Sequence, residues 1–239
     1  GDIILATKGI FIEPGEVLID AGITIIGGYD NPSWAPDHIP SVNYTVFQVQ
    51  TPYEWNGTSG NASATESRVF NIDATGKTVN ISNVTIKGGD ISGLAYPSSI
   101  GGAVLVSAGT LNLDYVNIMG SKALNGGGIY ISDATCNITN STISETVSTQ
   151  RGGGIYVGHN GSITNLSNST ISNNTCTDFG GGGIYVDGGT INRLANSTIS
   201  NNTSDNYGGG ILLWAEFTNS SINIVNSTIS GNTAVDNGD

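Results

Sequence analysis

One phrase, three glycines followed by isoleucine, constrains the fold of this chain more than any other feature. Its copies start at Gly126, Gly152, Gly181 and Gly208. A second phrase, Asn-Ser-Thr-Ile-Ser, follows each copy and starts at Asn140, Asn168, Asn196 and Asn226. The two phrases keep step over a period of about 25 to 30 residues, which is the period of a solenoid built from stacked coils.

The spacing of aliphatic residues predicts a corner inside the second phrase. Leu166 stands five positions before Ile171, and Leu194 stands five before Ile199. Side chains alternate between the two faces of a strand, so both residues can point inward only if the chain turns between them. The corner residue is asparagine in every unit but one: Asn83, Tyr115, Asn140, Asn168, Asn196 and Asn226. Asparagine tolerates the left-handed conformation, and we expect its amide to hydrogen-bond to the equivalent amide of adjoining coils as a structural ladder.

Two further features complete the coil. A second polar column predicts another corner and consists of Ser121, Thr146, Asn174, Asn202 and Asn232. The glycine triplet then lets the backbone turn tightly into the next strand. Three short strands and three corners per turn, with no amphipathic helix, predict an all-β right-handed parallel β-helix of about eight coils.

The solenoid is interpreted as a single domain over residues 1–239. Its N-terminal coils occupy residues 1–100 and are interrupted by an aromatic excursion at 31–68, whereas regular coils occupy 101–239. The isoleucines of the second phrase, such as Ile171 and Ile199, should be stacked and fully buried in the bore.

Charge and composition exclude several partners. The formal net charge is −12, from 7 Lys and Arg against 19 Asp and Glu, so no basic patch is expected for nucleic acid or anionic membranes. No apolar run is long enough for direct membrane insertion. Few charges with abundant Gly, Asn, Ser and Thr are typical of exported proteins, and an extracellular or cell-surface location is expected.

Metal and redox chemistry are not predicted. His38 and His159 are far from each other and from any cysteine pair, so no zinc spacing exists. We expect neither a metal nor a cofactor. Cys136 and Cys176 occupy different places in their coils, and a disulfide between them is left open.

The glycine phrases resemble those of a known group of proteins. Gly101-Gly102-Ala103-Val104 and Gly-Gly-Gly-Ile-Tyr are similar to the Gly-Gly-Ala-Ile repeats of polymorphic outer-membrane proteins, although isoleucine stands where those have phenylalanine in Phe-x-x-Asn. They look still more like adhesin-like β-helix proteins of bacteria and archaea, and residues 1–6 and 22–30 resemble the first coils of that group. The resemblance implies an exported, surface-anchored or secreted protein that adheres.

An enzyme is the alternative, because the pectate-lyase-like fold also serves polysaccharide lyases and glycoside hydrolases. Hydrolysis needs two carboxylates at a defined separation, and a lyase needs an acidic calcium cluster beside a basic group. The acids of the regular coils occur singly in separate turns: Asp114, Asp133, Glu145, Asp178, Asp187, Asp205 and Glu216. We therefore assign no catalytic residue and expect a protein that is not an enzyme.

Outward aromatic residues are the candidate binding positions. Tyr130, Tyr156 and Tyr185, continued by Leu105 and Leu212, should form one exposed column that either binds a sugar or protein or reinforces coil register. In the excursion, Trp34 and Trp55 either recognise a partner or cap the N-terminal end of the helix.

Glycosylation acceptors of the Asn-x-Ser/Thr type are frequent because the repeat is rich in asparagine, serine and threonine. Corner asparagines with amides turned inward should not carry a glycan. The better candidates are the loop acceptors Asn56, Asn61, Asn160 and Asn219.

Together these features favour a non-catalytic, exported surface scaffold or adhesin-like module that binds a glycan or surface protein. The chain begins at Gly1 and ends at Asp239, where another glycine triplet would be due, which we interpret as a processed chain or a fragment. Because unpaired strand edges must be covered, we expect the C-terminal face to meet either the rest of a longer protein or the next subunit of an end-to-end filament.

Overall fold

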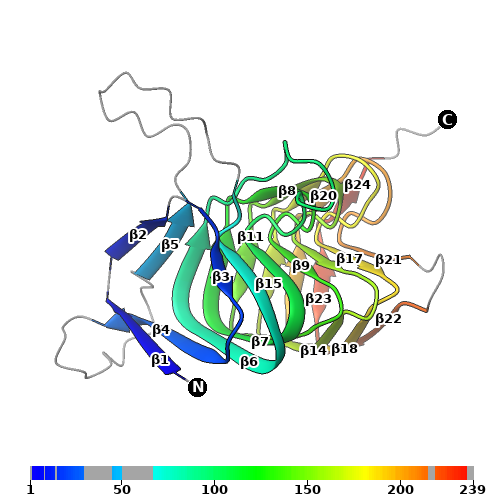
Figure 1. The fold of residues 1–239 in the computed structure, drawn as a ribbon. Helices are drawn as coiled ribbons and strands as arrows, with labels where there is room; N and C mark the ends of the chain where they lie inside the picture. The colour runs from blue at the N-terminus through cyan, green and yellow to red at the C-terminus, as the bar shows by residue number, and fades with distance from the viewer. Residues whose placement is uncertain are drawn as a thin grey trace.

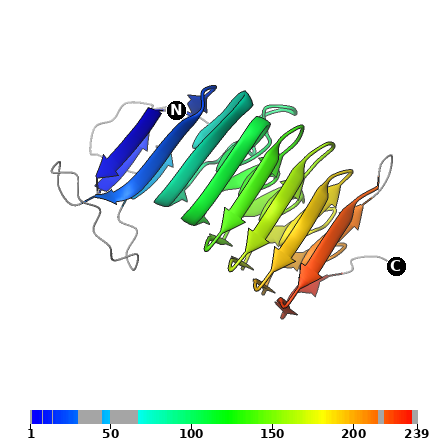
Figure 2. The same cartoon turned by 90° about the horizontal axis from the view of Figure 1, so that it is seen from below.

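The structure is a computed structural model that describes residues 2–7, 9–13, 15–29, 45–49, 67–214 and 219–235. Every regular element in these ranges is a β-strand. The strands stack in parallel from the N-terminal end to the C-terminal end, so each turn of the chain lies on the one before it (Figure 2). Successive turns follow the same outline in Figure 1. The parallel β-solenoid expected from the sequence is confirmed.

Each regular coil contains four strand segments. In the coil that starts at Gly126 they are β9 (Ile129–Ile131), β10 (Thr135–Thr139), β11 (Thr142–Ser144) and β12 (Val147–Arg151). The next coil has β13 (Ile155–Val157), β14 (Ser162–Ser167), β15 (Thr170–Ser172) and β16 (Thr175–Cys176). It is followed by β17 (Ile184–Asp187), β18 (Thr190–Ala195), β19 (Thr198–Ser200) and β20 (Thr203–Ser204). The last coil has β21 (Ile211–Trp214), β22 (Ser221–Val225), β23 (Thr228–Ser230) and β24 (Thr233–Ala234).

Upstream coils are built from longer and less regular strands. Here β6 (Phe70–Lys87) and β7 (Val104–Met119) run through their corners, and β7 leads to β8 (Lys122–Asn125). The first strands are β1 (Asp2–Thr7), β2 (Gly9–Glu13), β3 (Val17–Ile19), β4 (Ile23–Tyr29) and β5 (Thr45–Val49). They pair with β6 or with each other and so extend the stack.

Two details differ from the expected coil. The number of complete coils is taken from the 5-stranded sheet that runs from β8 to β24, to which each complete coil contributes one strand. This number is smaller than the eight or so expected. Within the described ranges, the earlier turns contribute no strand to this sheet. A fourth bend also separates the glycine strand from the following strand. Its left-handed residues are Gly109, Asp133, Asn160 and Gly188. The length of this bend changes from coil to coil, so the sequence carries no periodic signal for it.

The bore is filled by aliphatic columns in the expected register. Ile143, Ile171 and Ile199 lie directly above one another, followed by Ile229. Ile171 and Ile199 have no exposed surface, which confirms their predicted burial. In the last coil Ile229 is 47% exposed, since no further described coil covers it.

The asparagine corner has the predicted backbone conformation but sits nearer to solvent than expected. Asn140, Asn168 and Asn196 have φ values of 50°, 51° and 50°. The Asn168 amide donates to Asn140 Oδ1 at 3.4 Å, and the Asn140 amide donates to Asp114 Oδ1 at 2.8 Å. Asn168, Asn196 and Asn226 are exposed, so the expectation that corner amides turn inward is wrong.

A stronger amide ladder lies at the second corner. The backbone N–H and the side-chain amide of Asn174 both donate to Asn202 Oδ1, at 3.0 and 2.9 Å. Asn202 donates to Asn232 Oδ1 at the same two distances, 3.0 and 2.9 Å. Asn174 and Asn202 are fully buried, so this column satisfies polar groups inside the solenoid.

The serine of Asn-Ser-Thr-Ile-Ser forms a parallel ladder. The N–H of Ser141 donates to Ser169 Oγ at 3.1 Å, and the N–H of Ser169 donates to Ser197 Oγ at 3.1 Å. The N–H of Ser197 donates to Ser227 Oγ at 3.2 Å. In both ladders the backbone of one coil donates to a side chain of the next coil. The ladder side chains therefore all reach back toward the N-terminal end.

The predicted aromatic excursion is interrupted by a strand of the solenoid. Residues 45–49 form β5, which pairs with β2 and β6, so the prediction that 31–68 lies outside the coils is wrong for these five residues. The ring of Phe47 lies between Phe11 at 5.4 Å and Phe70 at 5.3 Å, which are centroid distances. Trp34, Trp55, Asn56 and Asn61 lie outside the described residues, so their binding, capping and glycosylation stay predictions.

Candidate functional site

The glycine-strand tyrosines form the expected stack. The ring centroids of Tyr130 and Tyr156 are 4.6 Å apart with 4° between the planes, and those of Tyr156 and Tyr185 are 5.3 Å apart with 11°. The predicted exposure of this column is wrong: Tyr130 and Tyr156 are each 8% exposed, and Tyr185 has no exposed surface. Side chains from the segments that precede the glycine corners, Ile100 and Phe179, pack against the column together with Leu212.

Burial keeps these phenols protonated. Removal from water raises the pKa of Tyr130 and of Tyr185 to about 12, and nearby Arg151 opposes the shift. Burial also raises the pKa of Tyr156, with Tyr130 and Asp187 adding to the effect, and the Tyr156 hydroxyl donates to Asp187 Oδ2 at 3.0 Å. The stack therefore offers hydrogen-bond donors and apolar rings, and no phenolate.

A group of two half-buried and two exposed side chains lies beside the stack at Tyr185. We call it the aromatic patch: Arg151, Phe179, Tyr207 and Trp214. The Phe179 ring is at its centre, with centroids 5.8 Å from Tyr207 and 5.1 Å from Trp214, both edge to face. Arg151 Cζ lies 4.8 Å from the Phe179 centroid. Tyr207 is 56% exposed and Trp214 36%, so two large rings face solvent beside a guanidinium.

The repeat itself positions the aromatic patch. Phe179 and Tyr207 each come directly before a glycine corner in successive coils, and the Tyr207 N–H donates to the Phe179 carbonyl at 3.2 Å. Trp214 ends β21 in register with Asp187 of β17. The sequence signal for the patch is an aromatic residue before two consecutive glycine runs, Phe179 and Tyr207, whereas the prediction rested on the tyrosines that follow the glycines.

The Tyr185 hydroxyl lies next to the Arg151 side chain of the patch. The hydroxyl and Arg151 Nε are both buried, and Arg151 opposes the rise of the Tyr185 pKa through its charge and a hydrogen bond. The patch thus combines exposed rings with a cation, which suits the apolar face of a sugar or of a peptide side chain.

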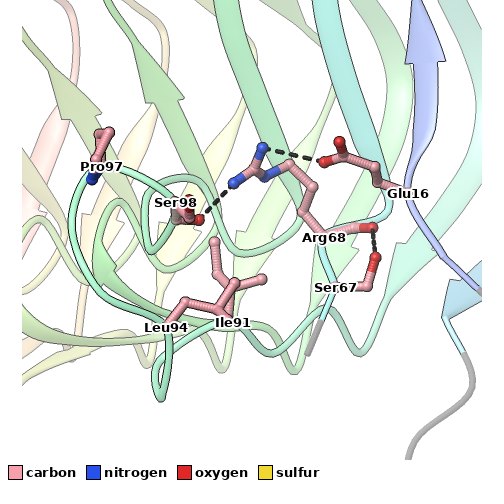
Figure 3. A pocket seen from close by; sticks show the side chains of 7 residues that line it. All are labelled: Glu16, Ser67, Arg68, Ile91, Leu94, Pro97 and Ser98. Atoms are coloured by element: carbon pink, nitrogen blue, oxygen red, sulfur yellow. Dashed lines mark hydrogen bonds and ion pairs between the residues drawn. The ribbon is translucent and has the colours of Figure 1, made fainter. Parts of the chain in front are cut away.

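A second concave feature lies near the N-terminal coils (Figure 3). This pocket has a volume of about 440 Å³ and is lined by Glu16, Ser67, Arg68, Ile91, Leu94, Pro97 and Ser98. Arg68 Nη1 donates to Glu16 Oε2 at 3.0 Å, and Nη2 donates to the Ser98 carbonyl at 2.6 Å. Burial lowers the Arg68 pKa, and the Glu16 charge opposes this shift. The guanidinium thus joins three chain segments, and its charge is already matched by a carboxylate.

Three carboxylates of the regular coils, those of Asp114, Asp133 and Asp187, accept hydrogen bonds from side chains of an adjoining coil. Asp114 accepts from Thr139 at 2.7 Å, and Asp133 accepts from Asn160 at 2.9 Å. Across the ranges that the structure covers, no three His, Cys, Asp or Glu residues come together to hold a metal ion. The same ranges contain no helix both long and apolar enough to cross a bilayer.

The two cysteines do not form a disulfide in the structure. Cys136 and Cys176 are both free and buried, and burial raises the pKa of Cys136 to about 12.

Of the glycosylation candidates, Asn160 and Asn219 are exposed. Their modification stays a prediction.

Comparison with known families agrees with this geometry. The family described as "Right handed beta helix region" matches residues 70–238. Because the match covers more than half of the chain, the protein belongs to that family of right-handed β-helices. No curated protein and no solved structure matched the chain.

Proposed function

We propose that this protein is a non-catalytic surface scaffold, an adhesin-like module outside the cell, that binds a glycan or a surface protein through the aromatic patch. The observation that carries the proposal is the pair of exposed rings, Tyr207 and Trp214, held around Phe179 beside Arg151. Rings held edge to face on a rigid solenoid lose little freedom when a ligand binds.

The non-catalytic part of the proposal is supported by the state of the acids. Asp114, Asp133 and Asp187 accept hydrogen bonds from neighbouring coils, so each serves coil-to-coil contact. A lyase or glycosidase needs acidic or basic groups that are available to the substrate, and a glycosidase needs two carboxylates that flank the bond to be cleaved. The same fold also serves carbohydrate-active enzymes, so the competing function is a polysaccharide lyase or glycoside hydrolase.

Glycan-array and surface-protein binding of the intact chain tests the proposal. We expect Trp214→Ala to reduce affinity at least about tenfold, the effect of losing one central aromatic contact. The matched control is Tyr115→Asn, which removes another exposed ring at a different corner and installs the residue that other coils use there. Equal loss in both variants contradicts the patch, and release of products from a polyuronide contradicts the non-catalytic role.

A further inference from the structure

We infer that the ligand of the aromatic patch is a neutral glycan, and that Asp187 is the residue that selects it over an acidic glycan. This inference rests on the proposed function, since it concerns the same site. Asp187 and Trp214 are the last residues of β17 and β21, which lie side by side in parallel register (Figure 1). In-register neighbours of a parallel pair point to the same face of a sheet. The Asp187 carboxylate therefore flanks the exposed Trp214 ring.

A hydrogen bond from the ring stack holds the Asp187 carboxylate in place without using all of its capacity. Its Oδ2 accepts from the Tyr156 hydroxyl at 3.0 Å. A carboxylate has two acceptor oxygens with about four lone-pair sites, so one hydrogen bond leaves sites for a ligand. Asp187 is half-buried, so part of its side chain is open to solvent. The hydroxyl groups of a sugar can donate to this oriented carboxylate.

A pyranose ring matches both parts of this surface. One of its faces carries C–H groups that pack on an aromatic ring, while its hydroxyl groups project around the edge. With that face on Trp214, the edge hydroxyls reach the carboxylate of the neighbouring strand, because adjacent strands lie about 4.8 Å apart. The Arg151 guanidinium, which lies over the Phe179 ring, adds N–H donors for sugar oxygens. The patch thus offers a ring, an acceptor and a donor to one sugar.

The charges around the patch disfavour an ionic ligand. A cationic side chain of a peptide would meet the Arg151 guanidinium, which lies 4.8 Å from the Phe179 centroid. An acidic sugar would meet Asp187, whose charge has the larger effect. Burial is the main cause of the raised Tyr185 pKa, and the charge of Asp187 then raises this pKa more than the charge of Arg151 lowers it. The net charge of −12 adds a long-range repulsion of anions. A neutral glycan avoids both penalties.

Matched oligosaccharides test this selection. The probes are tetrasaccharides of glucose, mannose, galactose and N-acetylglucosamine, and the same oligomers with their primary hydroxyl groups oxidised to carboxylates. We expect the intact chain to bind a neutral probe at least about tenfold more tightly than its oxidised form, the effect of one like-charge pair near a protein surface. Asp187→Asn should reduce this ratio at least about fivefold. The matched control is Asp114→Asn, which removes the same charge from a carboxylate bonded to Thr139 and should leave the ratio unchanged.

A second variant separates the charge of Asp187 from its hydrogen bonding. Asp187→Glu keeps the negative charge but moves the carboxylate by one methylene group, so it should still reject the oxidised probes and should bind the neutral probe more weakly. Equal or tighter binding of the oxidised probes by the intact chain would overturn the inference. Equal ratios in Asp187→Asn and Asp114→Asn would also overturn it, as would binding of none of the neutral probes.

The variant Trp214→Ala distinguishes failure of this inference from failure of the proposed function. If the intact chain prefers an acidic glycan or a lysine-rich peptide and this variant loses that binding, the patch is a binding site and only the neutral-glycan assignment is wrong. If the variant binds every probe as tightly as the intact chain does, the patch is not the site and both proposals are wrong.

Discussion

Asn202 shows how one side chain fixes the register of three coils. Its Oδ1 accepts from the backbone N–H and the amide of Asn174, and its own amide donates to the Ile171 carbonyl and to Asn232 Oδ1, each at 2.9 Å. The side chain is fully buried, so its removal leaves several polar atoms without partners. Register at this corner is therefore set by a specific polar network rather than by apolar contact alone.

The first prediction concerns that residue. Asn202→Ala should lower the free energy of unfolding by about 2 to 4 kcal/mol, because buried donors and acceptors lose their partners. Denaturant unfolding measures the change. Asn196→Gly is the matched control: Asn196 is exposed at φ 50°, a conformation that glycine adopts freely, so its stability should change by less than about 0.5 kcal/mol. Equal losses in the two variants would contradict the buried ladder.

A second prediction concerns the bore. Ile199 has no exposed surface, so Ile199→Asp would place a carboxylate among aliphatic side chains and should cost about 4 kcal/mol or more. Ile199→Val, which keeps the apolar shape, should cost about 1 kcal/mol. Thermal melting of both variants tests the assignment. An aspartate variant that melts like the parent would show that Ile199 does not face the bore.

At the scale of the element, the glycine corner is set by close approach between coils. A Cβ added at Gly182 would lie 2.4 Å from the carbonyl oxygens of Gly209 and Thr203. Both are backbone atoms, so a change of side-chain rotamer cannot relieve the clash. Gly182→Ala should therefore force successive corners apart and cost about 3 kcal/mol, in the range of overpacked cores. Gly15→Ala is the control, since a Cβ there meets nothing within 4 Å. Similar unfolding midpoints for the two variants would contradict this packing.

The tyrosine stack predicts a loss of stability at alkaline pH. The pKa values of Tyr130 and Tyr185 rise from 10.0 to about 12 through burial, so the folded protein holds these protons where the unfolded chain releases them. Their contribution is complete below pH 10 and is lost as the pH rises toward 12. Denaturant midpoints across this window test the effect, and Tyr185→Phe should reduce the slope. Stability that does not fall above pH 10 would contradict it.

At the scale of the whole molecule, much of the fold could be predicted because each buried column appears in the sequence as one residue type that recurs at the same place in successive repeats. The aliphatic columns through Ile171 and Ile199 and the left-handed asparagine corners follow from spacing and alternation alone. The N-terminal coils were harder to recognise. Strand β5 lacks both repeated phrases, and only its pairing with β2 and β6 reveals it.

The candidate site was less predictable than the fold. The alternation of apolar residues along the glycine strand correctly predicts that Tyr185 points away from the bore. The same pattern carries no information about other segments that pack over the outer face of the strand. Phe179 comes from such a segment and helps to bury the column. The exposed rings are instead Tyr207 and Trp214, whose meeting depends on contacts between successive coils.

Residue-resolved hydrogen exchange of the intact chain tests the coil-to-coil register most directly. The backbone N–H groups of Thr146, Asn174 and Asn202 each donate to a side chain of the next coil, at 3.1, 3.0 and 3.0 Å, whereas Asn232 lies in the last described coil. We expect the first three to exchange at least about 100-fold more slowly than Asn232, since they open only with the surrounding coils. Similar exchange at all four positions would contradict the proposed register.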